Sequence, residues 1–179
     1  MYCLADQRSM AARVYEFALY DAQILALKHD GIKVLIILGG CGGCDNPLYN
    51  VSTDEGRQGF ANYAVAVSRH YEDLYPGGVA LELWNEPVNS WRYPRESTLQ
   101  PPNDANLPLF NLLAESVGSA LGKLPGQTAL VAPGAWPHFG FLQGFINSSA
   151  MEHLSGFSVH PCECATLSML EHAVPVHLL

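Results

Sequence analysis

The chain reads Val79-Ala-Leu-Glu-Leu-Trp84, followed directly by Asn85-Glu86-Pro87. A short, mostly apolar run of this kind, bounded by turn residues, predicts a buried β-strand. A segment rich in helix-forming residues precedes it and ends at Pro76-Gly77-Gly78, which is a strong helix stop. A helix followed at once by a buried strand is typical of an α/β fold with a parallel sheet.

The same alternation of helix and strand extends to both sides of this stretch. Further strands are expected over 33–38, 128–132 and 156–160. Helices are expected over 9–29, 52–75, 109–124 and, with a weaker pattern, 140–153. The order αβαβαβαβ predicts one parallel sheet with right-handed crossovers, either as an open doubly wound sheet or as a segment of a barrel. No linker or repeat divides the chain, so residues 1–179 are expected to form one domain.

Three local patterns make sharper predictions. The apolar run 33–38 predicts a strand that is buried on both faces. Ser52 and Glu55 have the spacing of a capping box, with Ser52 as the N-cap of the second helix. The apolar side of the third helix is expected to hold Leu109, Leu112, Leu113 and Leu121.

The composition limits the classes of function. Of the 179 residues, 49% are hydrophobic and 15% are charged, which is typical of a globular protein. The formal net charge is −8 and no basic stripe is present, so the charge disfavours nucleic acid and anionic membrane surfaces as partners. No apolar run reaches the roughly 18 residues that a membrane helix needs. A neutral polymer such as a polysaccharide fits this charge better.

The sequence leaves the localisation open. Residues 1–12 lack a basic start followed by an apolar stretch, so no signal peptide is visible. Asn50-Val-Ser52 and Asn147-Ser-Ser149 match the N-glycosylation acceptor pattern. Such short motifs arise by chance, so they indicate secretion only weakly.

The cysteines are too few for a disulfide scaffold. They are Cys3, Cys41, Cys44, Cys162 and Cys164. Four thiolates from the CxxC and CxC pairs could in principle hold a zinc ion. A CxC half-site is unusual, however, so ordinary loop cysteines are the favoured interpretation and no metal is expected.

Glu86 is the strongest candidate for chemistry. It stands just beyond the strand 79–84, and catalytic residues in parallel sheets and barrels follow the carboxyl ends of strands. Glycosidic cleavage needs a carboxylic acid that protonates the leaving oxygen. An aromatic neighbour such as Trp84 lowers the local polarity, and the amide of Asn85 can hydrogen-bond a sugar hydroxyl. The simpler alternative, a solvated glutamate before a turn proline, is disfavoured by the position and the neighbours.

The stretch 81–87, Leu-Glu-Leu-Trp-Asn-Glu-Pro, resembles the end of strand 4 in the large (β/α)8 clan of retaining glycoside hydrolases. That clan includes cellulase-type endoglucanases, mannanases, β-xylosidases and β-glucuronidases. Its Asn-Glu-Pro glutamate is the acid/base, and its asparagine binds the 2-hydroxyl of the reacting sugar. The resemblance therefore implies that Glu86 is the acid/base and that Asn85 binds substrate, with no metal or organic cofactor.

Two further stretches are similar to this clan. The segment 38–49, which ends Asp-Asn-Pro-Leu-Tyr, resembles the loop after strand 3. Ser158-Val-His160-Pro161 resembles the end of strand 6, where the clan often reads His-Pro-Tyr. The resemblance implies that His160 lines the site, whereas a histidine bonded to the backbone is the alternative. Cys162 departs from the pattern, because it stands where a tyrosine often hydrogen-bonds the nucleophile.

Several aromatic residues are expected on the same side of the fold as Glu86. Trp91, Tyr93 and Trp136 fall in loops there, and Trp84 precedes Asn85 directly. Aromatic rings stack on the apolar faces of sugars, so these four side chains are candidates for substrate binding. Local packing is the alternative for each of them.

The resemblance runs from the helix after strand 2 to just past strand 6, which implies a partial (β/α)8 barrel. Strand 7, which carries the nucleophilic glutamate in the clan, has no clear counterpart, although 175–179 could be its beginning. A complete barrel typically needs about 250 residues, so a fragment with the acid/base half of the site is expected. The open edges of such a piece favour self-association.

Three hypotheses follow. The leading one is a retaining glycosidase that hydrolyses the O-glycosyl bonds of β-linked sugars, of which this chain holds the acid/base half. The second is a carbohydrate-binding remnant that binds an oligosaccharide or polysaccharide without turning it over. The third is a different α/β enzyme on an open sheet, in which the place of Glu86 is a coincidence.

Overall fold

The computed structural model describes residues 15–39, 51–85, 87, 107–126, 128–135 and 139–159. Its strands are β1 (Val34–Leu38), β2 (Val79–Leu83), β3 (Leu130–Ala135) and β4 (Gly156–Val159). They form one sheet in the order β1-β2-β3-β4, and each neighbouring pair is parallel. The predicted α/β class with a parallel sheet is therefore confirmed. In the described part of the chain the sheet is open, with β1 and β4 at its edges.

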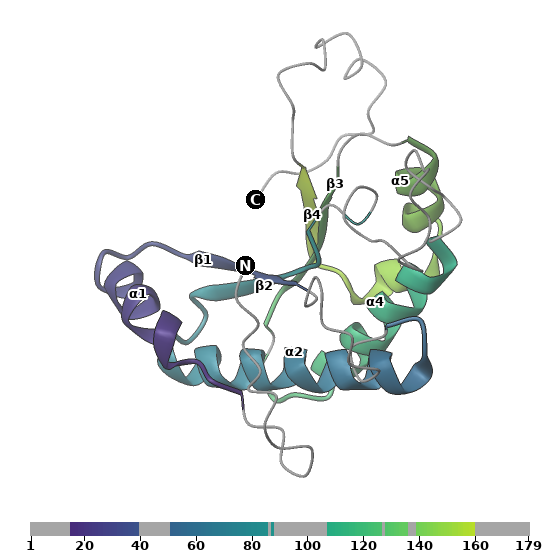
Figure 1. Ribbon diagram of the computed structural model, residues 1–179. Helices are drawn as coiled ribbons and strands as arrows, with labels where there is room; N and C mark the ends of the chain where they lie inside the picture. The colour runs from purple at the N-terminus through teal and green to yellow at the C-terminus, as the bar shows by residue number, and fades with distance from the viewer. Residues whose placement is uncertain are drawn as a thin grey trace, which may run out of the picture.

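Helices alternate with these strands along the chain. They are α1 (Ala18–His29), α2 (Asp54–Leu74), α4 (Leu107–Leu121), α5 (Phe139–Ile146) and the short 3-10 helix η3 (Ser149–His153). In Figure 1 the α-helices line the lower and right-hand side of the sheet, with α2 running beneath β1 and β2. The core lies between this helical layer and the sheet.

Strand register shows which side chains face the helices. Leu38 and Leu83 are paired across β1 and β2, and Leu81 is paired with Leu130 of β3. All four are buried in the core together with apolar side chains from α2 and α4. Because successive residues of a strand point to opposite faces, the residues between them point away from the helices.

The prediction that the first strand is buried on both faces is wrong. Leu35 is 45% exposed and Ile37 is 39% exposed, whereas Leu38 is fully buried. The physical reason is that helices cover only one face of the described sheet and that β1 is its edge (Figure 1). An apolar run cannot by itself distinguish a strand covered on both faces from one covered on a single face.

The first helix is shorter than its composition predicts. Residues 9–14 lie outside the described part of the chain, and α1 begins at Ala18. Phe17 is the N-cap residue, and its ring is stacked on His70 of α2 with the ring centroids 4.3 Å apart. An aromatic contact therefore joins the start of α1 to α2.

The apolar side of α4 also differs from the predicted one. Leu113 and Leu121 are buried as expected, but Leu112 is 43% exposed. Phe110 and Val117 complete the buried side instead. The spacing 110, 113, 117, 121 follows the helical period, and it places Leu112 on the solvent side.

Candidate functional site

All four strands end at the same edge of the sheet because every pair is parallel. Three of the predicted site positions directly follow strand ends: Trp84 follows β2, Trp136 follows β3 and His160 follows β4. In parallel sheets this carboxyl edge is the usual place of ligand sites. The fold is therefore compatible with a site assembled from the loops after β2, β3 and β4.

Trp84 turns the chain at the end of β2. Its φ of 67° lies in the left-handed region, which is rare for a bulky side chain and costs on the order of 1–2 kcal/mol. Its backbone N–H donates to the carbonyl of Leu38 over 2.9 Å. The half-buried indole lies against Phe60 of α2, with the ring centroids 5.8 Å apart. Sheet pairing and ring packing thus hold the strained conformation in place.

Asn85 and Pro87 follow this turn. Asn85 is half-buried, so part of its side chain is open to solvent. Pro87 is fully buried and anchors the chain on the far side of Glu86. Trp84 and Asn85 both take part in contacts within the structure. The segment is therefore fixed at both of its described ends.

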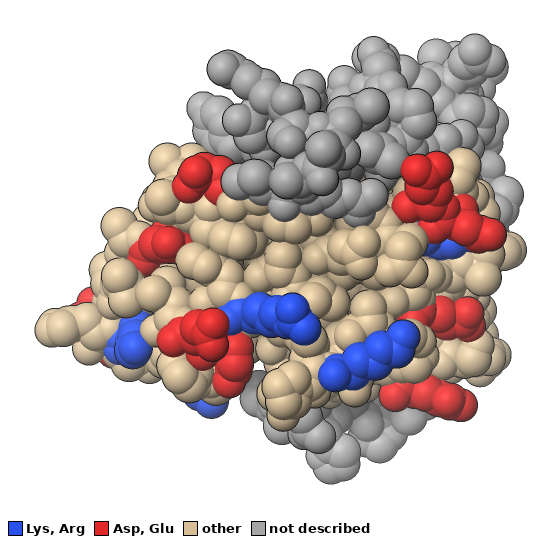
Figure 2. Space-filling model, turned by 90° about the horizontal axis from the view of Figure 1, so that it is seen from below, with Lys and Arg blue, Asp and Glu red and all other residues tan. Residues whose placement is uncertain are grey.

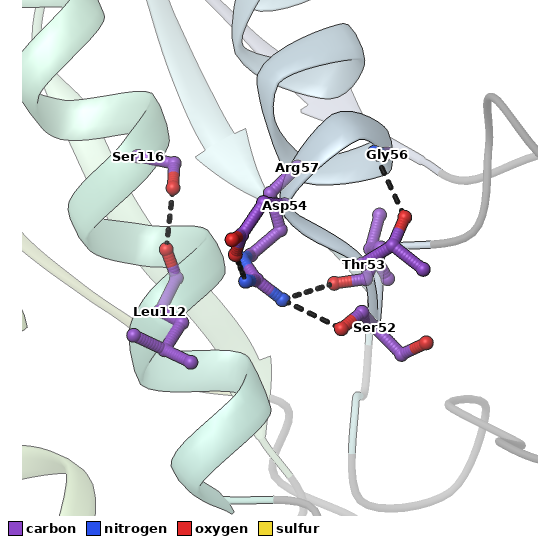
Figure 3. A network of polar contacts seen from close by, with 8 residues as sticks. Ser52, Thr53, Asp54, Gly56, Arg57, Leu112 and Ser116 are labelled. Carbon is purple, nitrogen blue, oxygen red and sulfur yellow. Dashed lines mark hydrogen bonds and ion pairs between the residues drawn. The ribbon is translucent and has the colours of Figure 1, made fainter.

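Arg57 fastens the beginning of α2, the helix that also carries Phe60. Arg57 is buried, and its guanidinium donates to the carbonyls of Val51 at 3.1 Å and Ser52 at 2.8 Å. It also forms an ion pair with Asp54, as Figure 3 shows. One side chain therefore fastens the entry loop of the helix to its first turn.

The predicted capping box is wrong by one residue. Thr53, not Ser52, is the N-cap, and its hydroxyl accepts from the backbone N–H of Gly56 over 3.1 Å (Figure 3). The carbonyl of Ser52 is bound by Arg57 instead. A buried arginine, the fourth residue of the helix, binds the entry loop, and the spacing of Ser52 and Glu55 does not reveal it.

Glu82 is a residue that the sequence interpretation missed. Its side chain is 1% exposed, although it stands in the middle of a strand. Register places it beside Ile37 of β1 and Val131 of β3, on the sheet face away from the helices. The sequence feature that could have indicated it is that Glu82 is the lone charged residue in the apolar run Val79–Leu83.

The remaining predicted site residues lie outside the described part of the chain. They are Glu86, Trp91, Tyr93, Trp136 and His160. The same holds for the five cysteines, the segment 45–49 and Asn50. Asn147, of the second N-glycosylation pattern, is exposed in the turn after α5.

Neither the charges on the face in Figure 2 nor the metal-binding groups of the described residues indicate a second site. The face in Figure 2 carries basic and acidic side chains interspersed, without a continuous basic patch. Within the ranges that the structure describes, no group of three or more His, Cys, Asp or Glu side chains is placed to hold a metal ion. A search of the same residues finds no helix long and apolar enough to span a membrane.

The fold and the strand ends define an α/β protein with polar and aromatic residues at the carboxyl edge of a parallel sheet. The sequence matches no protein-family model and shows no significant similarity to a curated protein. The functional argument therefore depends on the residues at this edge.

Proposed function

We propose that this chain carries the acid/base half of a retaining β-glycoside hydrolase site, with Glu86 as the acid/base and Asn85 as a ligand of the sugar. One observation supports this most strongly. Asn85 stands directly beyond β2, an inner strand of the parallel sheet, after a tryptophan in a strained left-handed conformation. Strain of this kind collects at functional sites, where surrounding structure maintains it.

The proposed chemistry requires two carboxyl groups. In a retaining glycosidase one protonates the leaving oxygen and the other, about 5 to 5.5 Å away, forms a covalent glycosyl intermediate. Glu86 has the first role in this proposal, and no residue of the chain is assigned the second. Half-buried Asn85 supplies an amide that can hydrogen-bond a sugar hydroxyl beside the reacting bond.

The corresponding fold proposal is a partial (β/α)8 barrel in which β1 to β4 stand for barrel strands 3 to 6. The parallel neighbour order and the helices along one sheet face support it (Figure 1). Leu35 and Ile37 would then belong to the barrel interior, where branched apolar side chains are usual. Their exposure makes self-association of the chain part of the proposal.

A binding experiment tests the sugar site without requiring a nucleophile. Calorimetric titration with β-1,4-linked glucose, mannose and xylose pentasaccharides is expected to show binding of at least one. Asn85→Ala should weaken it about five- to tenfold, since one hydrogen bond contributes roughly 1 kcal/mol. The matched control is Asn62→Ala, on the exposed side of α2, which should bind like the unchanged chain. A chain that binds none of the three sugars would contradict the proposal.

Measuring hydrolysis distinguishes the proposed glycosidase from the carbohydrate-binding alternative. Activated aryl β-glycosides need little acid assistance, so they report mainly on a nucleophile. Hydrolysis by the unchanged chain would show that a second carboxylate acts as the nucleophile. Sugar binding without hydrolysis would favour the carbohydrate-binding alternative for this chain on its own. In Glu86→Gln, unchanged hydrolysis of a glycoside with a poor leaving group would remove Glu86 from its proposed role.

A further inference from the structure

Glu82 is the acidic side chain that the described fold buries. At 1% exposure it lies in the interior, whereas Asp54, for comparison, is 98% exposed. Of the other described acidic residues none is buried. Removing a carboxylate from water costs several kcal/mol unless partners compensate for it. The fold itself does not require a carboxylate here, because aliphatic residues fill the neighbouring positions of the sheet.

The direction of the side chain follows from the register. Leu81 and Leu83 are buried in the core with the helices, so Glu82 between them points to the opposite face. Its lateral neighbours on that face are Ile37 and Val131, both aliphatic. Glu82 has an interaction partner in the structure, so it belongs to a polar arrangement.

Two unusual features lie next to each other at this strand end. Glu82 is a buried acid, and Trp84, two residues further on, is a bulky residue with φ at 67°. Asn85 follows directly. Natural sequences depart from the rules of stable packing mainly at functional sites, so two adjacent departures point to the same site.

We propose that Glu82 is a positioning residue of the sugar site, which holds the carboxyl end of β2 in the conformation that presents Asn85. The inference rests on the proposed function. Glu82 does not itself contact the sugar, because its side chain is closed to solvent. It also cannot be the missing nucleophile. That carboxylate must bond to the sugar, and the side chain of Glu82 is closed to solvent.

The test compares stability with binding in the same variants. Glu82→Leu replaces the carboxyl group by an apolar side chain like those of the neighbouring strand residues. Glu82→Gln keeps the shape and the hydrogen-bonding capacity. Glu82→Leu leaves the partner of Glu82 unpaired, so its urea midpoint is expected to fall, and the affinities are compared in buffer without urea, where each variant is first shown to be folded. The affinity of Glu82→Leu for the pentasaccharide bound by the unchanged chain should fall at least tenfold, and the affinity of Glu82→Gln should fall less.

The outcomes distinguish this inference from the proposed function. If the unchanged chain binds no pentasaccharide, the proposed function fails and this inference fails with it. If the unchanged chain binds and both variants bind within twofold of it, Glu82 is not a positioning residue. A lower urea midpoint with unchanged affinity assigns Glu82 a structural role only and likewise overturns the inference.

Discussion

At the scale of single residues, Arg57 makes the most specific prediction about stability. Its buried guanidinium binds two carbonyls and the carboxylate of Asp54. Arg57→Met fills a similar volume but leaves these carbonyls without their donor, so unfolding should become easier by about 2–3 kcal/mol. Urea denaturation followed by circular dichroism measures this change.

The matched controls separate the carbonyl contacts from the ion pair. Asp54 is 98% exposed, so Asp54→Ala should cost less than about 1 kcal/mol. Arg69→Met, on the exposed side of α2, should leave the midpoint almost unchanged. An equal loss of stability in Asp54→Ala and Arg57→Met would show that the ion pair, and not the hydrogen bonds to the carbonyls, fastens the helix.

Tyr71 predicts a dependence of stability on alkaline pH. Burial, with smaller effects of Asp21 and Tyr20, raises the pKa of Tyr71 to about 12 from 10.0. Well below pH 10 the phenol is protonated in both states, so the full stabilisation is present. Between pH 10 and 12 the unfolded chain loses the proton first, and the free energy of unfolding falls by up to about 3 kcal/mol.

Tyr71→Phe isolates this effect because it keeps the ring and removes the titrating group. The variant should lose less stability than the unchanged chain between pH 10 and 12, as measured by urea midpoints at several pH values. The same slope in both proteins would show that the folded environment does not hold the phenolic proton.

At the scale of elements, Gly118 allows α4 to approach η3 closely. A Cβ at this position would lie 2.2 Å from the Cβ of His153. Glycine to alanine inside a helix normally stabilises it by about 1 kcal/mol, but here the clash should dominate. Gly118→Ala is therefore expected to destabilise the protein by about 1–2 kcal/mol in thermal or urea unfolding. Ser119→Ala, exposed on the same helix, is the control and should be neutral or stabilising.

The sequence predicts the elements better than their ends and faces. Helix and strand alternation was sufficient for the order of α1 to β4 and for the parallel sheet, since both follow from local pattern and crossover rules. The start of α1, the N-cap Thr53 and the exposed face of β1 were not predicted. The start of α1 lies against α2, and the exposure of β1 depends on what covers the sheet, neither of which a local pattern contains. The N-cap at Thr53 goes with the contacts of the Arg57 side chain, which the spacing of Ser52 and Glu55 does not reveal.

At the scale of the whole molecule, the candidate site was predictable only as a list of strand ends. Parallel pairing brings the ends of β1, β2, β3 and β4 to one edge, as the sequence interpretation required. The buried carboxylate of Glu82 and the left-handed turn at Trp84 arise from the packed sheet. A sequence pattern gives residue types and spacing, but it gives neither depth nor backbone strain.

The exposed apolar edge predicts that the chain associates with itself. Seven large apolar side chains are exposed among the described residues, and five of them, Leu19, Leu25, Ile32, Leu35 and Ile37, lie in or beside α1 and β1. An open, apolar edge strand readily pairs with another chain. The average mass measured by sedimentation velocity should rise with protein concentration, over a range that extends to on the order of 100 µM.

A charge on the exposed face of β1 should prevent this association. Leu35→Lys places an ammonium on the open edge strand, beside Ala80, and should return the chain to monomer mass, because burying that charge in an interface is costly. Ile146→Lys, on α5, changes a side chain of similar exposure outside the α1–β1 region and should leave the association as it is. If Ile146→Lys dissociates the chain and Leu35→Lys does not, the contact lies elsewhere than on β1. If the unchanged chain is monomeric throughout, the open sheet edge is protected without a second copy.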